Sequence, residues 1–105
     1  MMTITNNGMN DITSFIKRDV VYAEYKSGST WYRIALHDIR VISSTKIAIY
    51  IMFGVDVPNT ISGIRLCNAA GQIWAQDTQV VINKASYPEG ILYRFTITLV
   101  QESET

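Results

Sequence analysis

The sequence predicts a mainly β protein, an antiparallel β-sandwich preceded by one N-terminal α-helix. Near the N-terminus, apolar residues recur at spacings of three and four, as on one face of a helix. The remainder alternates at period two in short runs, which is typical of half-buried strands. Tight-turn residues separate these runs, as in antiparallel sandwiches. The length of 105 residues fits a single domain.

The helix is expected over residues 4–18, with Thr3, Thr5, Asn6 or Asn7 as its N-cap. Gly8 in a helix costs about 1 kcal/mol relative to Ala, and close approach of a neighbouring backbone is one reason to accept that cost. The helical stripe either covers the open end of its own sandwich or pairs with copies of itself. Its candidate interface residues are Met9, Ile12, Phe15 and Ile16.

The sandwich is expected over residues 20–100. Turn residues divide most of it into three hairpins, over residues 20–26 and 30–36, 38–42 and 45–53, and 61–68 and 72–77. A short strand over 79–83 and a long strand over 91–100 follow. One face of the long strand carries Ile91, Tyr93, Phe95, Ile97 and Leu99. The polar residues 101–105 are expected to fray.

The segment 45–53 is apolar on both faces of its predicted strand. Ile47, Ile49, Ile51 and Phe53 share one face, whereas Ala48, Tyr50 and Met52 share the other. A strand with one solvated face would carry polar residues there. Either the helix or a loop covers this second face, or it is a subunit interface. Tyr50 and Met52 therefore join the candidate interface residues.

The titratable residues form no catalytic or metal-binding motif. His37 and Cys67 each occur once, and the carboxylates are scattered. Cys67 is expected to act as a small buried hydrophobe, and His37 as an ordinary residue at a strand end. We therefore expect no catalytic residues, no cofactor and no metal, and a protein that is not an enzyme.

Charge and hydropathy restrict the partners. Nine Lys and Arg balance nine Asp and Glu without a basic cluster, so nucleic acid is not an expected partner. The longest apolar run, residues 47–53, is too short to cross a bilayer, and no secretory signal is apparent. We expect a soluble protein without a membrane partner. A net charge near zero permits self-association, so a homo-oligomer is expected.

Aromatic side chains are the strongest candidates for contact with a ligand or partner. Trp31 shares its strand parity with Arg33, and Trp74 shares its parity with Gln72 and Gln76. An outward Trp beside amides or Arg can stack on a sugar or anchor a protein. The alternative is that each Trp packs at a sheet edge. The candidate contact residues are Trp31, Tyr32 and Trp74.

Four segments resemble small structural proteins of the tail tip or baseplate in siphophages that infect Gram-positive bacteria, with a Bacillus phage as one candidate source. They are Ile4-Thr5-Asn6-Asn7-Gly8-Met9-Asn10, residues 61–71 (ISGIRLCNAAG), residues 72–75 (QIWA) and residues 89–96 (EGILYRFT). The match covers most of the chain and is weakest in the middle. The chain is also similar to the shoulder domains of receptor-binding proteins.

That resemblance implies a β-sandwich with an N-terminal helix, located in the virion tail and made as a late protein in the host cytoplasm. It implies other tail or baseplate proteins as partners, and homo-oligomers with a trimer as one candidate state. The expected function is a non-catalytic structural component of the tail tip, baseplate or a fibre adaptor. The alternative is a host-adsorption module that binds host cell-wall saccharide or another receptor. No separate head domain is present, which favours the structural role.

Overall fold

A computed structural model describes residues 3–58, 60–87 and 89–100. The expected fraying of residues 101–105 lies outside the described residues. The chain is mainly β, with one N-terminal helix followed by antiparallel sheets in a sandwich-like arrangement, which confirms the predicted fold class. Its elements in chain order are α1 (Asn6–Asp19), β1 (Val20–Ser27), β2 (Thr30–Ala35), β3 (Asp38–Ser43), β4 (Lys46–Phe53), β5 (Thr60–Ile61), β6 (Gly63–Asn68), β7 (Ile73–Asp77), β8 (Ile82–Asn83), the 3-10 turn η1 (Lys84–Ser86) and β9 (Ile91–Thr98).

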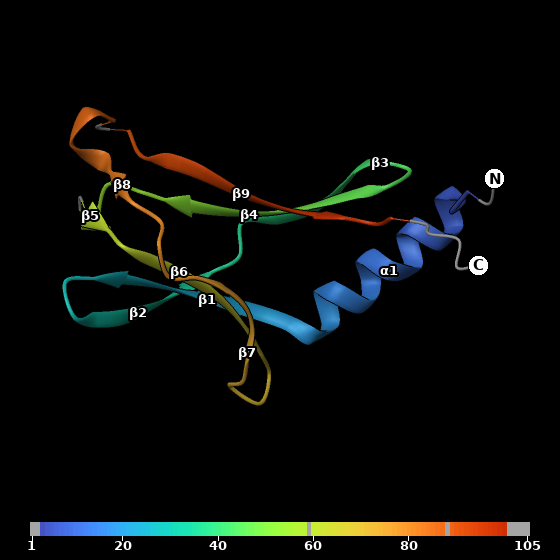
Figure 1. Ribbon diagram of the computed structural model, residues 1–105, viewed down its shortest axis with the longest axis horizontal. Helices are drawn as coiled ribbons and strands as arrows, with labels where there is room; N and C mark the ends of the chain where they lie inside the picture. Colours follow the sequence, from blue (N-terminus) through green and yellow to red (C-terminus); the bar gives the residue numbers. More distant parts are fainter. Residues whose placement is uncertain (1–2, 59, 88, 101–105) are drawn as a thin grey trace, which may run out of the picture.

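Two larger sheets form the layers of the sandwich (Figure 1). One has the strand order β2-β1-β6-β7, and the other has the order β3-β4-β9. The three predicted hairpins are present as β1–β2, β3–β4 and β6–β7, all antiparallel. Because β9 pairs with β4 after a long excursion of the chain, the second sheet is completed only by the last strand.

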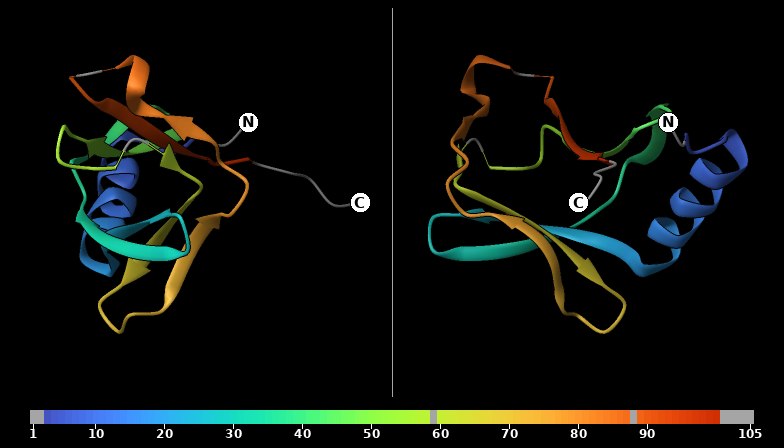
Figure 2. Two further views of the ribbon diagram at one scale, coloured as in Figure 1. Left: turned by 90° about the vertical axis from the view of Figure 1, so that its left-hand side faces the viewer. Right: turned by 45° about the vertical axis from the view of Figure 1, so that its right-hand side comes forward.

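The helix and a small ribbon close opposite ends of the sandwich. Figure 2 shows α1 spanning the gap between the sheets at one end, while β5 and β8 lie at the other. Helix α1 packs against β1 and β3, one strand from each sheet. The helix therefore covers the open end of its own sandwich, one of the two alternatives that the sequence leaves open.

Local sequence explains where α1 begins. The hydroxyl oxygen of Thr5 accepts a hydrogen bond from the Gly8 amide at 3.2 Å, as an N-cap residue does. A Cβ added at Gly8 would lie 2.8 Å from the Cγ2 atom of Ile4. Gly8 thus makes room for the Ile4 side chain, rather than for the neighbouring backbone considered as one reason from the sequence.

The core lies between the sheets and is densest along β4. Four side chains of its inner face are completely buried, those of Ile47, Ile49, Ile51 and Phe53. Opposite them in register lie the inner-face residues of β9. Burial of a large apolar side chain contributes about 1.5–3 kcal/mol, so β4 is the strand on which folding depends most.

One region differs from the predicted strand pattern. The predicted strand 61–68 is divided at Ser62, whose amide donates to the carbonyl of Lys26 at 2.9 Å. On the far side of that break, β5 pairs with β8, to which only the end of the predicted strand 79–83 contributes. The buried Lys84 donates from Nζ to the carbonyl oxygen of Val57. This contact links η1 to the chain that precedes β5.

Substitution of Gly90 should destabilise the fold. Gly90 has a φ of 106°, and a Cβ there would lie 2.5 Å from the backbone oxygen of Phe53. We expect Gly90→Ala to lower the free energy of unfolding by about 1–3 kcal/mol, measured by urea denaturation. Gly54→Ala is the matched control, because its Cβ would meet only the flexible carboxylate of Asp56 at 3.3 Å. Equal stability of the two variants would contradict this account of the turn.

Candidate functional site

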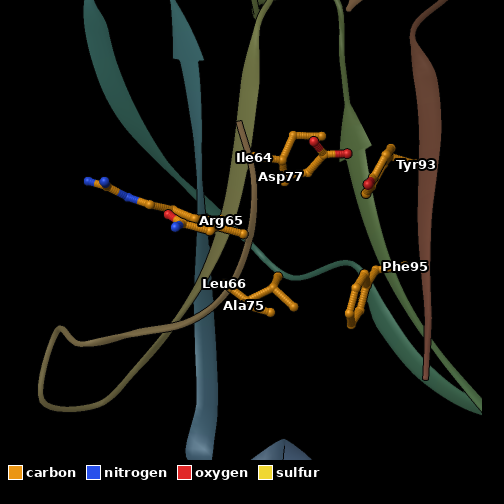
Figure 3. A pocket seen from close by; sticks show the side chains of 8 residues that line it. Ile64, Arg65, Leu66, Ala75, Asp77, Tyr93 and Phe95 are labelled. Carbon is orange, nitrogen blue, oxygen red and sulfur yellow. The ribbon is translucent and has the colours of Figure 1, made fainter. Parts of the chain in front are cut away.

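A cleft opens between the two sheets on the side where β7 faces β9. It encloses about 210 Å³. Figure 3 shows Tyr93 and Phe95 of β9 pointing across it toward Ile64 and Leu66 of β6. The complete lining, called here the β7–β9 cleft, is Ile64, Arg65, Leu66, Ala75, Gln76, Asp77, Tyr93 and Phe95.

The position of β9 at the end of its sheet explains the cleft. Side chains of β9 alternate between half-buried and exposed along all eight residues, whereas the inner face of the neighbouring β4 is fully buried. Thus Tyr93, Phe95 and Ile97 point into the sandwich but remain partly open to solvent. An apolar strip of this kind is suited to contact with another apolar surface.

A second, more open hollow borders the beginning of β9. It encloses about 650 Å³ and has Val81, Tyr87 and Leu92 in its lining, all of them exposed. Tyr93 lines both this hollow and the β7–β9 cleft. The two hollows therefore follow β9 from its first residues to Phe95.

In the described part of the chain, the backbone of β9 is also unpaired along the edge that faces away from β4. The amide of Leu99 donates to the carbonyl of Thr45 at 2.7 Å, so Leu99 faces β4. In an antiparallel pair the N–H and C=O groups of successive residues point alternately to the two sides. By this alternation, Tyr93, Phe95 and Ile97 face β4, while the main-chain groups of Leu92, Arg94, Thr96 and Thr98 face the free edge. In the described part of the chain, no strand pairs with that edge.

Two helix residues predicted as a subunit interface belong to the protein's own core. Met9 is 1% exposed and Ile16 is 4% exposed. Ile12 is half-buried and packs against the same core. The prediction that Met9 and Ile16 contact another subunit is corrected, because α1 uses this face to close its own sandwich.

Phe15 and Trp74, predicted separately, come together. Both are exposed, at 50% and 39% respectively. They line one shallow hollow, whose other lining residues are Asp19, Asn68, Ala69 and Ala70. Sequence reasoning did not pair them, because their proximity depends on how α1 packs beside the β6–β7 turn.

Trp31 and Tyr32 are held by neighbours within the four-stranded sheet. The guanidinium of Arg65 lies 4.0 Å from the centre of the Trp31 ring. A Cβ at Gly63 would lie 2.9 Å from the indole of Trp31, so this glycine makes room for the ring. Tyr32 stacks on the buried Tyr25 with ring centres 5.3 Å apart. These contacts favour a packing role for Trp31, the alternative considered above.

Tyr50 and Met52 lie on the outer face of the three-stranded sheet. Met52 is exposed and stands opposite the exposed Leu92 of β9. Tyr50 is half-buried, with the guanidinium of Arg40 5.3 Å from its ring centre. The third residue of this face, Ala48, is completely buried, whereas α1 contributes its buried residues to the core between the sheets.

Cys67 is buried on the outer face of the four-stranded sheet. Its thiol donates to the Glu24 carboxylate at 3.6 Å, and Arg65 binds the same carboxylate at 2.7 Å. Burial is the largest of the effects that raise the pKa of the Cys67 thiol, which disfavours the nucleophilic thiolate. Among the described residues, no group of three or more His, Cys, Asp and Glu side chains is placed to hold a metal ion.

The sequence does not identify the edge of β9 as a candidate site, although it carries a signal for it. The alternation over residues 91–100 predicts a strand, but it singles out no residue of that strand as a contact. A strand of eight residues with one charge, Arg94, and no proline lacks the features that usually protect a sheet edge. What the sequence did not reveal is which strand of the sandwich lies at an edge.

Comparison of the chain with protein-family models, curated proteins and solved structures gives no match. No helix in residues 3–58, 60–87 and 89–100 has both the length and the apolar character needed to cross a bilayer.

Stability should fall at alkaline pH. Burial raises the pKa of Tyr25 and Tyr93 above their ordinary value of 10.0, and that of Cys67 above 9.0. The folded state then binds these protons more tightly than the unfolded chain does. The stability is therefore fully present below the ordinary pKa values, and it is lost as the pH rises through the raised pKa values of the folded state. We expect the free energy of unfolding to decline from about pH 9 upward, with a shallower decline in Tyr93→Phe. A free energy that rises over this range would contradict the assignment.

Proposed function

We propose that the protein is a non-catalytic assembly component that docks through β9, and that its setting is a bacteriophage tail: the tail tip, the baseplate or a fibre adaptor. The observation that carries the docking role is the combination of a free backbone edge with half-buried Tyr93 and Phe95 on one strand. Main-chain groups at such an edge supply affinity, and adjoining hollows supply selectivity for side chains.

The dimensions of the β7–β9 cleft support docking of a chain segment. At about 210 Å³ it lies below the range of roughly 300–1,000 Å³ that is usual for small-molecule sites. It is large enough to admit one or two apolar side chains of a partner. Its walls include Ile64, Leu66, Ala75 and Phe95, while Asp77 and Gln76 add polar groups.

The phage setting is supported by the sequence resemblance, and three of the resembling segments meet at the cleft. Residues 61–71 contain β6 and the turn after it, residues 72–75 contain the first part of β7, and residues 89–96 contain most of β9. The docking surface is thus built from segments on which the resemblance rests. In this proposal the protein is part of the virion and contacts other tail or baseplate proteins.

The virion proposal predicts that the protein is incorporated into particles. We expect quantitative mass spectrometry of density-purified phage, raised on a host that carries the gene, to find a fixed copy number per particle. Gold-labelled antibody should mark the tail in electron micrographs. Abundant protein in the lysate with none in the purified particles would contradict the proposal.

A saccharide-binding role is the second candidate, favoured by the hollow that Phe15 and Trp74 share. Two exposed aromatic rings near the carboxylate of Asp19 offer stacking and a hydrogen bond to a sugar. Trp31 and Trp74 do not form one platform, because β2 and β7 are opposite edges of a four-stranded sheet. At about 4.8 Å between neighbouring strands, these edges lie roughly 14 Å apart.

Titration with host cell-wall polymers tests this candidate. If sugar binds at the hollow, tryptophan emission should change on titration, and Trp74→Ala should abolish that change. Trp31→Phe is the matched control, which should retain it because Trp31 is packed against Gly63 and Arg65. An unchanged spectrum of the native protein, or equal loss in both variants, would exclude this hollow as the sugar site.

A further inference from the structure

The exposed edges of the two larger sheets differ in how they are protected. Edge strands usually avoid pairing with other chains through charged residues, bulges or short length. On β3, Arg40 binds Asp38 and the register shifts near its end. The five-residue β7 has a register shift within its pairing to β6. The six-residue β2 carries Arg33, whose guanidinium lies 3.7 Å from the ring centre of Tyr22.

Among the described residues, β9 is the least protected of these edges, although it also carries one charged residue. Its eight residues pair with β4 without a shift in register. Its single charged residue, Arg94, lies on the outer face beside Thr96 and Thr98, and its inner face presents Tyr93, Phe95 and Ile97 half-buried. A regular strand of eight residues is about 27 Å long. It is therefore the edge best able to accept another strand.

We propose that β9 pairs antiparallel with β9 of a second copy of this chain, in a two-fold dimer centred on Phe95. The two three-stranded sheets then become one continuous sheet of six strands. This inference rests on the docking role proposed for β9 and names its partner. A trimer, which the family resemblance implies as one candidate, cannot be built from this two-fold contact alone.

The register follows from overlap, parity and charge. Because β9 covers Ile91–Thr98, two copies overlap most when the axis lies at Arg94 or at Phe95. A two-fold antiparallel pairing keeps the inner faces together only if the axis passes through a residue position. An axis at Arg94 would place two guanidinium groups opposite each other, which is destabilising. An axis at Phe95 instead places Arg94 opposite Thr96, Tyr93 opposite Ile97, and Phe95 opposite its own copy.

Backbone geometry also favours the axis at Phe95. The main-chain groups of Phe95 face β4, so on the free edge the two Phe95 residues form a pair without mutual hydrogen bonds. In such pairs the Cα atoms lie about 4.5 Å apart, closer than in the hydrogen-bonded pairs. The two rings and the two β7–β9 clefts would meet at the axis. The half-buried strips of both copies, Tyr93, Phe95 and Ile97, would cover each other. No like charges stand opposite each other at this register.

Charge variants at Thr96 test both the dimer and its register. Purified protein is examined by sedimentation velocity from about 10 μM to about 1 mM. We expect a concentration-dependent dimer of the native chain. Thr96→Glu places an acid opposite Arg94 twice per dimer and should tighten dimerisation between about two- and thirtyfold. Thr96→Lys places like charges there and should weaken it by a similar factor.

Thr98→Glu is the matched control, on the same face of the same strand but opposite the uncharged Leu92. It should leave the dissociation constant nearly unchanged. A monomer at every concentration, a dimer insensitive to both Thr96 variants, or a dimer that responds to Thr98→Glu alone would each overturn the proposed pairing. Incorporation into particles is measured separately, so failure of this pairing and failure of the virion proposal are distinguishable.

Discussion

The ladder between β4 and β9 is the contact on which the rest of the structure depends. Eight residue pairs run without a shift in register, and β4 fully buries Ile47, Ile49, Ile51 and Phe53 beneath them. Each such side chain contributes about 1.5–3 kcal/mol, against a total stability of about 5–15 kcal/mol for a typical domain. The last strand is therefore required to complete the sheet. Because β9 comes last in its sheet, its second edge has no strand beside it in the described structure.

The surface of the sandwich has two kinds of region. In one, polar side chains bind one another, and in the other, main-chain groups have no strand partner among the described residues. On the outer face of the four-stranded sheet, Arg33 and Arg65 lie over the rings of Tyr22 and Trp31, and Glu24 binds Arg65. Polar groups there already have partners within the sheet. Along β9, by contrast, no strand of the described chain pairs with the outer edge, and the rings of Tyr93 and Phe95 remain partly exposed although they pack against the core. Docking is accordingly proposed at β9, which belongs to the other sheet.

Local features were predictable from the sequence because they depend on neighbouring residues. Thr5, the N-cap, is one of the four candidate residues, the turns predict the three hairpins, and the alternation of residues 91–100 predicts β9. Features that depend on distant pairing were not predictable. The break at Ser62 arises because β5 pairs with β8 rather than continuing β6. The burial of Met9 and Ile16 reflects the fit of α1 to the end of its own sandwich, which periodicity alone does not distinguish from an intermolecular contact.

Hydrogen exchange of individual β9 amides tests the central claim most directly. In dilute protein, the amides of Tyr93, Phe95 and Ile97 should be protected by β4, whereas those of Arg94 and Thr96 should exchange rapidly at the free edge. At high concentration, the amides of Arg94 and Thr96 should become protected while the first group changes little. Uniform protection along β9 in dilute protein, or rapid exchange of Arg94 and Thr96 at every concentration, would contradict the account of β9 as a free edge that pairs with its own copy.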